Sequence, residues 1–386
     1  MKIPSDWNMA KFGELAKITC GVAATPEYVD AAIGIPFLSA RNVQKERLDL
    51  SYFQHIPREL HEKLTKNTKP AKGDVLLTRV GAGIGEAAVV DIDFEFSIYV
   101  SLTLIKCGKN LDSEYVKSLL NTNYYRYLAT RDQFAGGGVQ NLNVQMVKEY
   151  PIPVPPLPEQ KKIAKILSTW DKAITTTEQL LANSQQQKKA LMQQLLTGKK
   201  RLRDKNGVRF SGEWKHGHLS DLGEISKGKA LSNKDLIDGD YPVIAGGKSS
   251  PYNHRDFTHE NVITVSASGA YAGYVAYHPY KLWASDCSVV MGKANTDIRF
   301  IYQLMSHMQS KIYSLQSGGA QPHVYPKDLE VLRVSIPSIE EQQKIATVLS
   351  AADNEIEILK KQLDQLKQEK KSLMQQLLTG KRRVLV

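Results

Sequence analysis

The nine residues LMQQLLTGK occur twice in this 386-residue chain, at 191–199 and at 373–381. The two copies are 182 positions apart (373 − 191), and the same offset aligns PPLPEQKKIAKILSTWDKAI at 155–174 with PSIEEQQKIATVLSAADNEI at 337–356. Identity of this length does not recur by chance, and internal repeats are the first property to test in a new sequence. The chain is therefore predicted to be a duplication, so its fold has to contain two equivalent halves.

The similarity continues upstream of these segments, but it weakens. Short matches persist between the halves: residues 137–140 with 318–321, Gly81 and Gly85 with Gly269 and Gly273, and residues 12–15 with 222–225, which follow Trp7 and Trp214. Each half is predicted to be a variable body followed by a preserved helical tail. We expect body 1 at residues 1–154, the first helical region at 155–203, body 2 at 204–336 and the second helical region at 337–386.

The preserved tails have the apolar spacing of a coiled coil. Apolar residues recur in steps of four and three along 163–195, and the same spacing returns along 345–377. Both copies place a lysine at one position of this seam, Lys188 and Lys370, where it either extends its charged end outward or fixes the register. Prolines precede each segment, and Gly198 and Gly380 follow it, as at helix ends. Each tail is predicted to be a helix of about 40 residues, about 60 Å long.

Two long helices with matching stripes are expected to pack together as an antiparallel coiled coil, with the bodies at opposite ends and related by a pseudo-twofold axis. The alternative is two surface helices that each cover their own body, although a single amphipathic helix rarely continues so far unbroken. At the start of the second helix, Ser338 and Glu341 fit a capping box. At the start of the first, Glu159 suits the helix dipole.

The bodies mix strand and helix patterns. Residues 73–90 and 260–277 each read as a strand, a glycine turn and a second strand, while 113–131 and 297–316 read as amphipathic helices. A glycine loop follows each of these helices. The predicted fold class is α/β: two bodies with mixed or antiparallel sheets, separated by the two long helices.

A search for catalytic motifs returns only weak matches. Residues 81–85, GAGIG, match the glycine turn of S-adenosylmethionine-dependent methyltransferases, but body 2 does not keep the spacing, the next segment reads as a strand, and no motif for holding a target base follows. The short ExK pattern of nucleases occurs at 159–161 and 213–215, as chance predicts in a lysine-rich chain. There is no P-loop motif, and histidines 254, 259, 278, 307 and 323 lack metal-ligand spacing. The sequence predicts no catalytic residue, cofactor or metal.

The net charge of the chain indicates the class of partner that it binds. Lysine and arginine exceed aspartate and glutamate to give a net charge of +11, which makes nucleic acid a candidate partner. No apolar run is long enough for a membrane helix, and the first 15 residues do not resemble a signal peptide. Cys20, Cys107 and Cys287 are far apart in the sequence, as expected for reduced thiols in a cytoplasmic protein.

The duplicated helical regions, the twin tags and the segments GDVLLTRVGAGIGEAAVV and GGGVQNLN together resemble the specificity subunits of type I restriction–modification systems. The resemblance covers essentially the whole chain. It implies two target-recognition domains, each reading one half of a bipartite, asymmetric site in double-stranded DNA, and an antiparallel coiled coil between them. It also implies two methyltransferase subunits as partners, restriction subunits that join the complex for cleavage, and no catalysis by this chain. Body 2 departs from the family pattern at SASGAYAG and GGAQPHV.

Base reading requires polar or cationic side chains on exposed loops. The candidates are Arg41, Asn42, Lys45, Arg79, Gln140, Asn141 and Asn143 in body 1, and Lys248, Ser249, Ser250, Tyr271, Gln321, His323 and Tyr325 in body 2. A solvated turn or a helix cap remains the alternative for these residues. The basic residues after each tag, at 199–203 and 381–383, are candidates for phosphate contacts.

The tags are predicted to be two equivalent platforms for two identical methyltransferase subunits, because a twofold set of partners needs a matching twofold surface. Leu191, Leu195, Leu373 and Leu377 continue the seam, which leaves the glutamines to face outward or toward a partner: Gln193, Gln194, Gln375 and Gln376. Two other classes stay open: a stand-alone duplicated DNA-binding regulator, and a methyltransferase fused to its own recognition domains. The absence of a motif that holds a target base argues against the latter.

Overall fold

The computed structural model describes residues 3–22, 26–131, 141–232, 234–248, 250, 252–319 and 321–385. These residues form two compact units. Unit 1 comprises Met1–Thr177 and Leu363–Val386, and unit 2 comprises Glu178–Gln362. Each unit therefore contains one body, the half of one long helix that adjoins this body in the sequence, and the far half of the other.

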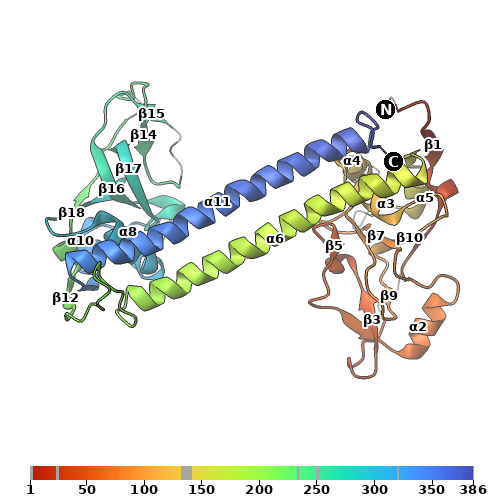
Figure 1. Ribbon diagram of the computed structural model, residues 1–386, viewed down its shortest axis with the longest axis horizontal. Helices are drawn as coiled ribbons and strands as arrows, with labels where there is room; N and C mark the ends of the chain where they lie inside the picture. Colours follow the sequence, from red (N-terminus) through yellow and green to blue (C-terminus); the bar gives the residue numbers. More distant parts are fainter. Residues whose placement is uncertain are drawn as a thin grey trace. The chain divides into compact units, whose positions relative to one another are not determined.

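The two long helices are confirmed. Helix α6 spans Leu157–Leu195 and α11 spans Ile339–Leu377, and each is 39 residues long and unbroken (Figure 1). Gly198 and Gly380, which follow the helices, both have a φ of 71°. This left-handed conformation is one that glycine adopts at little cost, so both glycines terminate the helices as predicted.

Within each unit the two helix segments run antiparallel. In unit 1, Glu159 near the start of α6 binds Arg383 beyond the end of α11, and Asp171 binds Lys370. In unit 2, Glu341 near the start of α11 binds Arg201 beyond the end of α6, and Asp353 binds Lys188. Residue numbers rise along one helix as they fall along the other, which is the predicted antiparallel pairing. The predicted seam residues, among them Leu167, Leu195, Leu349 and Leu377, are buried or half-buried.

Body 1 is built on a four-stranded and a three-stranded sheet. The larger has the order β2 (Ala16–Cys20), β10 (Leu102–Cys107), β7 (Val75–Thr78) and β8 (Ala87–Val89), all antiparallel. The smaller has the order β6 (Gln54–Ile56), β3 (Ile35–Leu38) and β9 (Ser97–Ile98), with β3 parallel to β9. Two strand pairs complete it: β1 (Asn8–Lys11) with β11 (Pro151–Val154), and β4 (Val43–Gln44) with β5 (Arg47–Leu48).

Body 2 joins the equivalent strands into one six-stranded sheet. Its order is β13 (Gly223–Lys227), β18 (Cys287–Gly292), β16 (His259–Ser266), β17 (Val275–Ala284), β14 (Tyr241–Ile244) and β15 (Asn253–His254). The ten-residue β17 pairs with β16 from Val275 to Leu282 and runs parallel to β14 at its last two residues, so it makes the pairings that β8 and β9 share in body 1. A separate pair, β12 (Lys215–His218) with β19 (Arg333–Ile336), matches β1 with β11.

Short helices cover the sheets. In body 1 they are α1 (Phe12–Leu15), α2 (Arg58–Thr65), α3 (Ser113–Leu120), α4 (Asn123–Arg131) and α5 (Val144–Lys148), with a 3-10 turn at Ala40–Asn42. In body 2 they are α7 (Leu219–Leu222), α8 (Ile298–His307), α9 (Gln309–Tyr313) and α10 (Pro326–Glu330), with a 3-10 turn at Gly269–Tyr271.

The two single helices expected at 113–131 and 297–316 are wrong, because each is broken into two. Asn121 ends α3, and its side-chain amide donates to the carbonyl of Ala87 and accepts from the Ala87 N–H, at 2.8 and 3.1 Å. Gln309, 188 positions later, bonds in the same way to the carbonyl of Gly273 and the N–H of Val275, at 2.8 and 3.1 Å. A polar side chain that satisfies a strand end interrupts the helix in both bodies.

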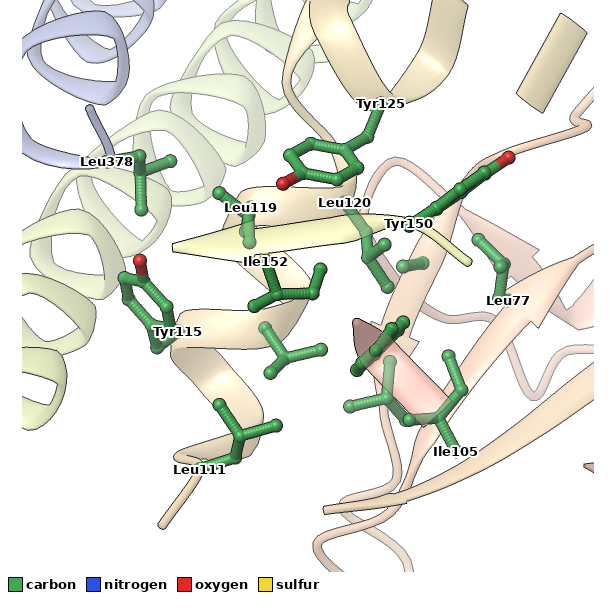
Figure 2. Packing of buried hydrophobic residues seen from close by; sticks show 14 of the residues in the cluster. Leu77, Ile105, Leu111, Tyr115, Leu119, Leu120, Tyr125, Tyr150, Ile152 and Leu378 are labelled. Atoms are coloured by element: carbon green, nitrogen blue, oxygen red, sulfur yellow. The ribbon is translucent and has the colours of Figure 1, made fainter. Parts of the chain in front are cut away.

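The apolar residues of the tags lie in the cores of the units. Met374, Leu377 and Leu378 belong to the main core of unit 1, with Tyr115 and Leu119 of α3. Figure 2 shows Leu378, which follows α11, on the same side of this cluster as Tyr115. In unit 2 the equivalent residues are Met192, Leu195 and Leu196. Each tag thus packs against the body that precedes the other tag in the sequence, a contact that the repeat alone did not predict.

Candidate nucleic-acid interface

The candidate residues of body 1 cluster where strands β3, β7 and β10 meet. The backbone of Ala40, in the turn after β3, donates to the Ser101 hydroxyl at 2.9 Å, and the N–H of Arg79, after β7, donates to the Ser101 carbonyl at 2.9 Å. Ser101, just before β10, therefore holds the Ala40–Asn42 turn beside Arg79. No sequence signal had singled out this serine.

Within that turn, Arg41 and Asn42 have different roles. Asn42 is 2% exposed, and its side chain accepts from the Ser39 N–H at 2.9 Å and donates to the carbonyls of Asp49 and Tyr52 at 2.8 Å. These bonds fold the loop and leave the amide little surface for a base. Arg41 is exposed, with its guanidinium 5.2 Å from the centre of the Tyr52 ring. Arg41 is thus positioned to meet a ligand, while Asn42 shapes the turn.

Arg79 supports the glycine loop. It is 7% exposed, its Nε donates to the Leu142 carbonyl at 2.9 Å, and a terminal nitrogen donates to the Asn141 side chain at 2.8 Å. Asn143 is exposed and caps α5, because its side chain accepts from the Gln145 N–H at 2.8 Å. The structure thus brings Arg79, Asn141 and Asn143 together; Gln140 lies outside the described residues.

Body 2 repeats the backbone frame around these residues. The N–H of Gly85 donates to Thr78 O at 2.8 Å, as that of Gly273 does to Ser266 O. Likewise Leu142 donates to Arg79 O at 2.9 Å, and Val324 donates to Ala267 O at 3.0 Å. Gly81, Gly85, Gly269 and Gly273 all have left-handed φ angles between 79° and 92°. The predicted pairing of the two glycine turns is therefore correct in three dimensions.

The exposed side chains on this frame differ between the bodies. In body 2 the Lys248 ammonium lies 5.0 and 5.4 Å from the ring centres of Tyr271 and Tyr274. The rings of His323 and Tyr325 stack with their centres 6.0 Å apart. The 3-10 turn that contains Tyr271 adjoins the His323 segment through a bond from the Gly269 N–H to Pro322 O of 3.1 Å.

The remaining candidates of body 2 are placed as follows. Gln321 is exposed beside this cluster. The Ser250 hydroxyl lies within hydrogen-bond distance of the carbonyls of Val243 and Tyr252, at 2.8 and 2.7 Å, and its one proton is donated within its own loop. Ser249 lies outside the described residues. Tyr52 and Tyr274, which present rings to Arg41 and Lys248, were not predicted.

A second unpredicted feature is a cluster that we call the helix-end clamp: Trp7, Glu159 and Arg383 in unit 1, and Trp214, Glu341 and Arg201 in unit 2. In unit 1 the Trp indole donates to the Glu carboxylate at 3.1 Å, and the Arg donates to both carboxylate oxygens at 2.7 and 2.8 Å. In unit 2 the corresponding distances are 3.0, 2.6 and 2.6 Å.

The helix-end clamp corrects one interpretation from the sequence, the capping box. Glu159 lies in the first turn of α6 as predicted, and Glu159 and Glu341 are 2% and 1% exposed, so both carboxylates are also buried acceptors. Ser338 still accepts from the Glu341 N–H, at 3.4 Å, but the Glu341 carboxylate binds Arg201 and Trp214 instead of returning to the cap. The hydrogen bonds that Arg383 donates to Glu159 and Asp6 raise its pKa, and those that Arg201 donates to Glu341 raise the pKa of Arg201. Arg201 and Arg383, one arginine from each predicted phosphate-binding run, are thus occupied by the clamp.

The tag glutamines lie on the outside of the units. Gln193, Gln194 and Gln375 are exposed and Gln376 is half-buried, whereas the leucines beside them enter the cores. Among the described residues no group of histidine, cysteine, aspartate or glutamate could hold a metal ion. Within that same part of the chain, no helix is both long and apolar enough to cross a membrane.

Comparison with known proteins identifies the family. The model of the type I restriction modification DNA specificity domain matches residues 4–183 and 211–368, one match beginning in each half. This chain belongs to that family. A relative named as the MjaX specificity subunit of a type I restriction enzyme, from Methanocaldococcus jannaschii, is 26% identical and covers 99% of this chain and 95% of its own length. The MjaVIII specificity subunit from the same organism is 23% identical, with coverages of 100% and 95%.

Solved structures show the same fold. The S subunit of a type I restriction–modification system from M. genitalium aligns with a TM-score of 0.69 at 17% identity and covers 98% of both chains. A chain from a study of complex assembly and conformational transition in a type I system aligns with a TM-score of 0.56 at 14% identity. The predicted fold class and the resemblance stated from the sequence are both confirmed.

Proposed function

We propose that this specificity subunit reads a bipartite, asymmetric site in double-stranded DNA, body 1 (1–154) reading one half and body 2 (204–336) the other. The helical regions, 155–203 and 337–386, bind two copies of a methyltransferase subunit. Restriction subunits join through that complex. The chain itself carries no catalytic step and binds no cofactor.

One observation carries this proposal: the two bodies keep the same backbone frame but present different side chains on it. The bonds that set the glycine turn are matched pair by pair, while Arg41 and Asn141 in body 1 give way to Lys248, Tyr271 and His323 in body 2. Guanidinium, ammonium and amide groups bond to base edges, and arginine and lysine also bind phosphates. A constant frame with variable polar tips is suited to reading two different sequences.

Body replacement tests the division of labour. Residues 1–154 are exchanged for the equivalent body of a relative, the complex is assembled with its methyltransferase, and the methylated sites are sequenced. One half of the site should change and the other should stay. A change in both halves would contradict the assignment of one half-site to each body.

The tag glutamines test the partner surface. A negative charge introduced on this surface, by Gln194→Glu in one variant and Gln376→Glu in another, should weaken one methyltransferase site each, and the double variant should lose the two-to-one complex in native mass spectrometry. Gln187→Glu is the matched control, because Gln187 is an exposed glutamine of α6 outside the tag. A full complex in the double variant would show that the tag serves the unit cores alone.

Two further measurements address the alternatives. Calorimetry of the isolated chain with S-adenosylmethionine and with ATP should give no binding heat, and stoichiometric binding would favour a fused enzyme. Purification from the native cell should bring down a methyltransferase subunit. A chain that purifies alone and still binds DNA would favour the stand-alone regulator.

A further inference from the structure

In body 1 a short hairpin, β4 (Val43–Gln44) and β5 (Arg47–Leu48), carries the candidate Lys45 at its tip. Gln44 pairs with Arg47, so the connection is a two-residue turn of Lys45 and Glu46. Their φ angles are 52° and 63°. Turns of this kind favour asparagine and glycine, because other residues pay a steric cost in the left-handed region. Such a turn is stable only where contacts with neighbouring residues stabilise it.

Two contacts hold this turn. The Glu46 N–H donates to the Glu86 carboxylate at 3.0 Å, from the end of the glycine turn. The Glu46 carboxylate binds the Lys370 ammonium of α11 at 2.5 Å, and Lys370 also binds Asp171 of α6 at 2.6 Å. Lys370 is 9% exposed. Burial opposes the charged form of this lysine, yet Glu46 and Asp171 raise its pKa above the ordinary value.

Unit 2 contains the same lysine without the hairpin. Lys188 binds Asp353 at 2.5 Å, as Lys370 binds Asp171, and Asp353 accepts from Gln303 at 2.6 Å. Within the described residues, Lys188 has no second carboxylate partner. Fifteen residues (39–53) connect β3 to β6, but only eight (245–252) connect β14 to β15, and the described ones among those eight form no strand. Among the residues that the structure describes, the connection from the seam lysine to a loop between the first strands of the body occurs only in body 1.

We propose that Lys370 and Glu46 are specificity-determining positioning residues, which fasten the recognition hairpin of body 1 to the two long helices and so fix where Lys45 and Arg41 meet the DNA. This inference rests on the proposed function. A second link supports it: Arg47, the other end of the turn, donates to the Thr175 hydroxyl of α6 at 3.1 Å. The hairpin is thus attached to both helices, while Lys45 stays exposed.

The test uses three variants of the full complex: Glu46→Gln, Lys370→Met and, as the matched control, Lys188→Met. Binding is measured on duplexes with single-base changes in each half of the methylated site, and body replacement assigns the halves. In Glu46→Gln and Lys370→Met, discrimination in the body 1 half should fall by roughly tenfold, about the effect of one good base contact. Discrimination in the body 2 half should be unchanged, and Lys188→Met should leave the body 1 half unchanged.

Two results would overturn the inference: unchanged discrimination by Glu46→Gln in the body 1 half, or an equal loss in both halves. Glu46→Gln keeps the Lys370–Asp171 pair, so it reports on the hairpin even if Lys370→Met fails to fold. A wild-type complex that selects no bipartite site would instead refute the proposed function. The two failures are therefore distinguishable.

Discussion

Glu159 and Glu341 stand 182 positions apart and bind the same partners, whereas Arg79 and Ala267, 188 positions apart, share a backbone position and nothing else. The first pair sits in the helix-end clamp and the second on the candidate DNA surface. The contacts of the helix-end clamp are repeated in both units, whereas the side chains on the candidate DNA surface and the contact of Glu46 with Lys370 are not. The two halves of the duplication thus share their backbone frame and the helix-end clamp, but they differ in the side chains on their surfaces.

The interiors of the bodies also differ, as strands β16 and β17 show. Body 2 contains a hydrogen bond of 2.9 Å between the Thr264 hydroxyl and His278, both buried between strands β16 and β17. An offset of 188 places Leu76 and Val90 of body 1 at the same positions, both fully buried. A polar, titratable pair therefore replaces an apolar one, which makes the stability of body 2 dependent on pH.

The largest expected effect comes from the tag leucines. Leu195→Ala and Leu377→Ala, at residues 0% and 2% exposed, should each lower the free energy of unfolding by about 3 kcal/mol, the usual cost of an emptied core site. Hydrogen exchange should show the loss of protection in unit 2 for Leu195→Ala and in unit 1 for Leu377→Ala. The exposed Leu180, changed to alanine, is the control. Loss of protection in the opposite units would refute the crossed packing of the tags.

The next effect in size is expected from replacing the glutamates of the helix-end clamp. Alanine at Glu341 leaves Arg201 without its buried partner and should lower the stability of unit 2 by about 3 kcal/mol. Alanine at Glu159 should cost unit 1 less, about 2 kcal/mol, because the Arg383 side chain is 42% exposed and that of Arg201 is 21%. Urea unfolding followed by hydrogen exchange compares the two. Equal losses of stability in the two units would mean that the exposure of the arginine does not affect how much each clamp contributes.

Acid should destabilise unit 2 through His278. Burial lowers the pKa of His278 to about 4, from an ordinary 6.5. Between these values the unfolded chain takes up a proton that the folded unit refuses, so stability is complete above about pH 6.5 and falls as the pH drops. The expected loss is about 2 kcal/mol at pH 5.

The double variant Thr264→Leu and His278→Val, which copies the body 1 pair, should remove this part of the acid sensitivity. Unfolding midpoints measured from pH 7 to pH 5 decide the matter. If the wild type and the double variant have parallel pH profiles, another group is responsible.

The sequence predicted the features that follow from spacing. The heptad steps specified the long helices, Gly198 and Gly380 ended them, and the repeated glycines matched the two turns. Beyond the antiparallel pairing of the two long helices, it did not predict which residues far apart in the chain contact one another. The helix-end clamp joins residues that are 127 to 224 positions apart, and nothing local in Glu159 distinguishes a buried acceptor from a helix-end charge. The offset of 182, which relates Glu159 to Glu341 and Arg201 to Arg383, was the signal that could have found it.

The smallest expected effect concerns Asn143, for which capping and base reading are competing roles. Tyr325 occupies its position in body 2, and there Asp328 accepts from the Tyr325 N–H at 3.3 Å at the start of α10. Asn143→Ala removes the side-chain acceptor of α5 and should lower the stability of unit 1 by about 1 kcal/mol. Asn143→Asp keeps this acceptor but loses the amide donors that would bind a base. If Asn143 reads DNA, the aspartate variant keeps its stability and loses selection in the body 1 half of the site. Full selection by a stable aspartate variant would limit Asn143 to capping and leave base reading in body 1 to Arg41, Lys45 and their neighbours.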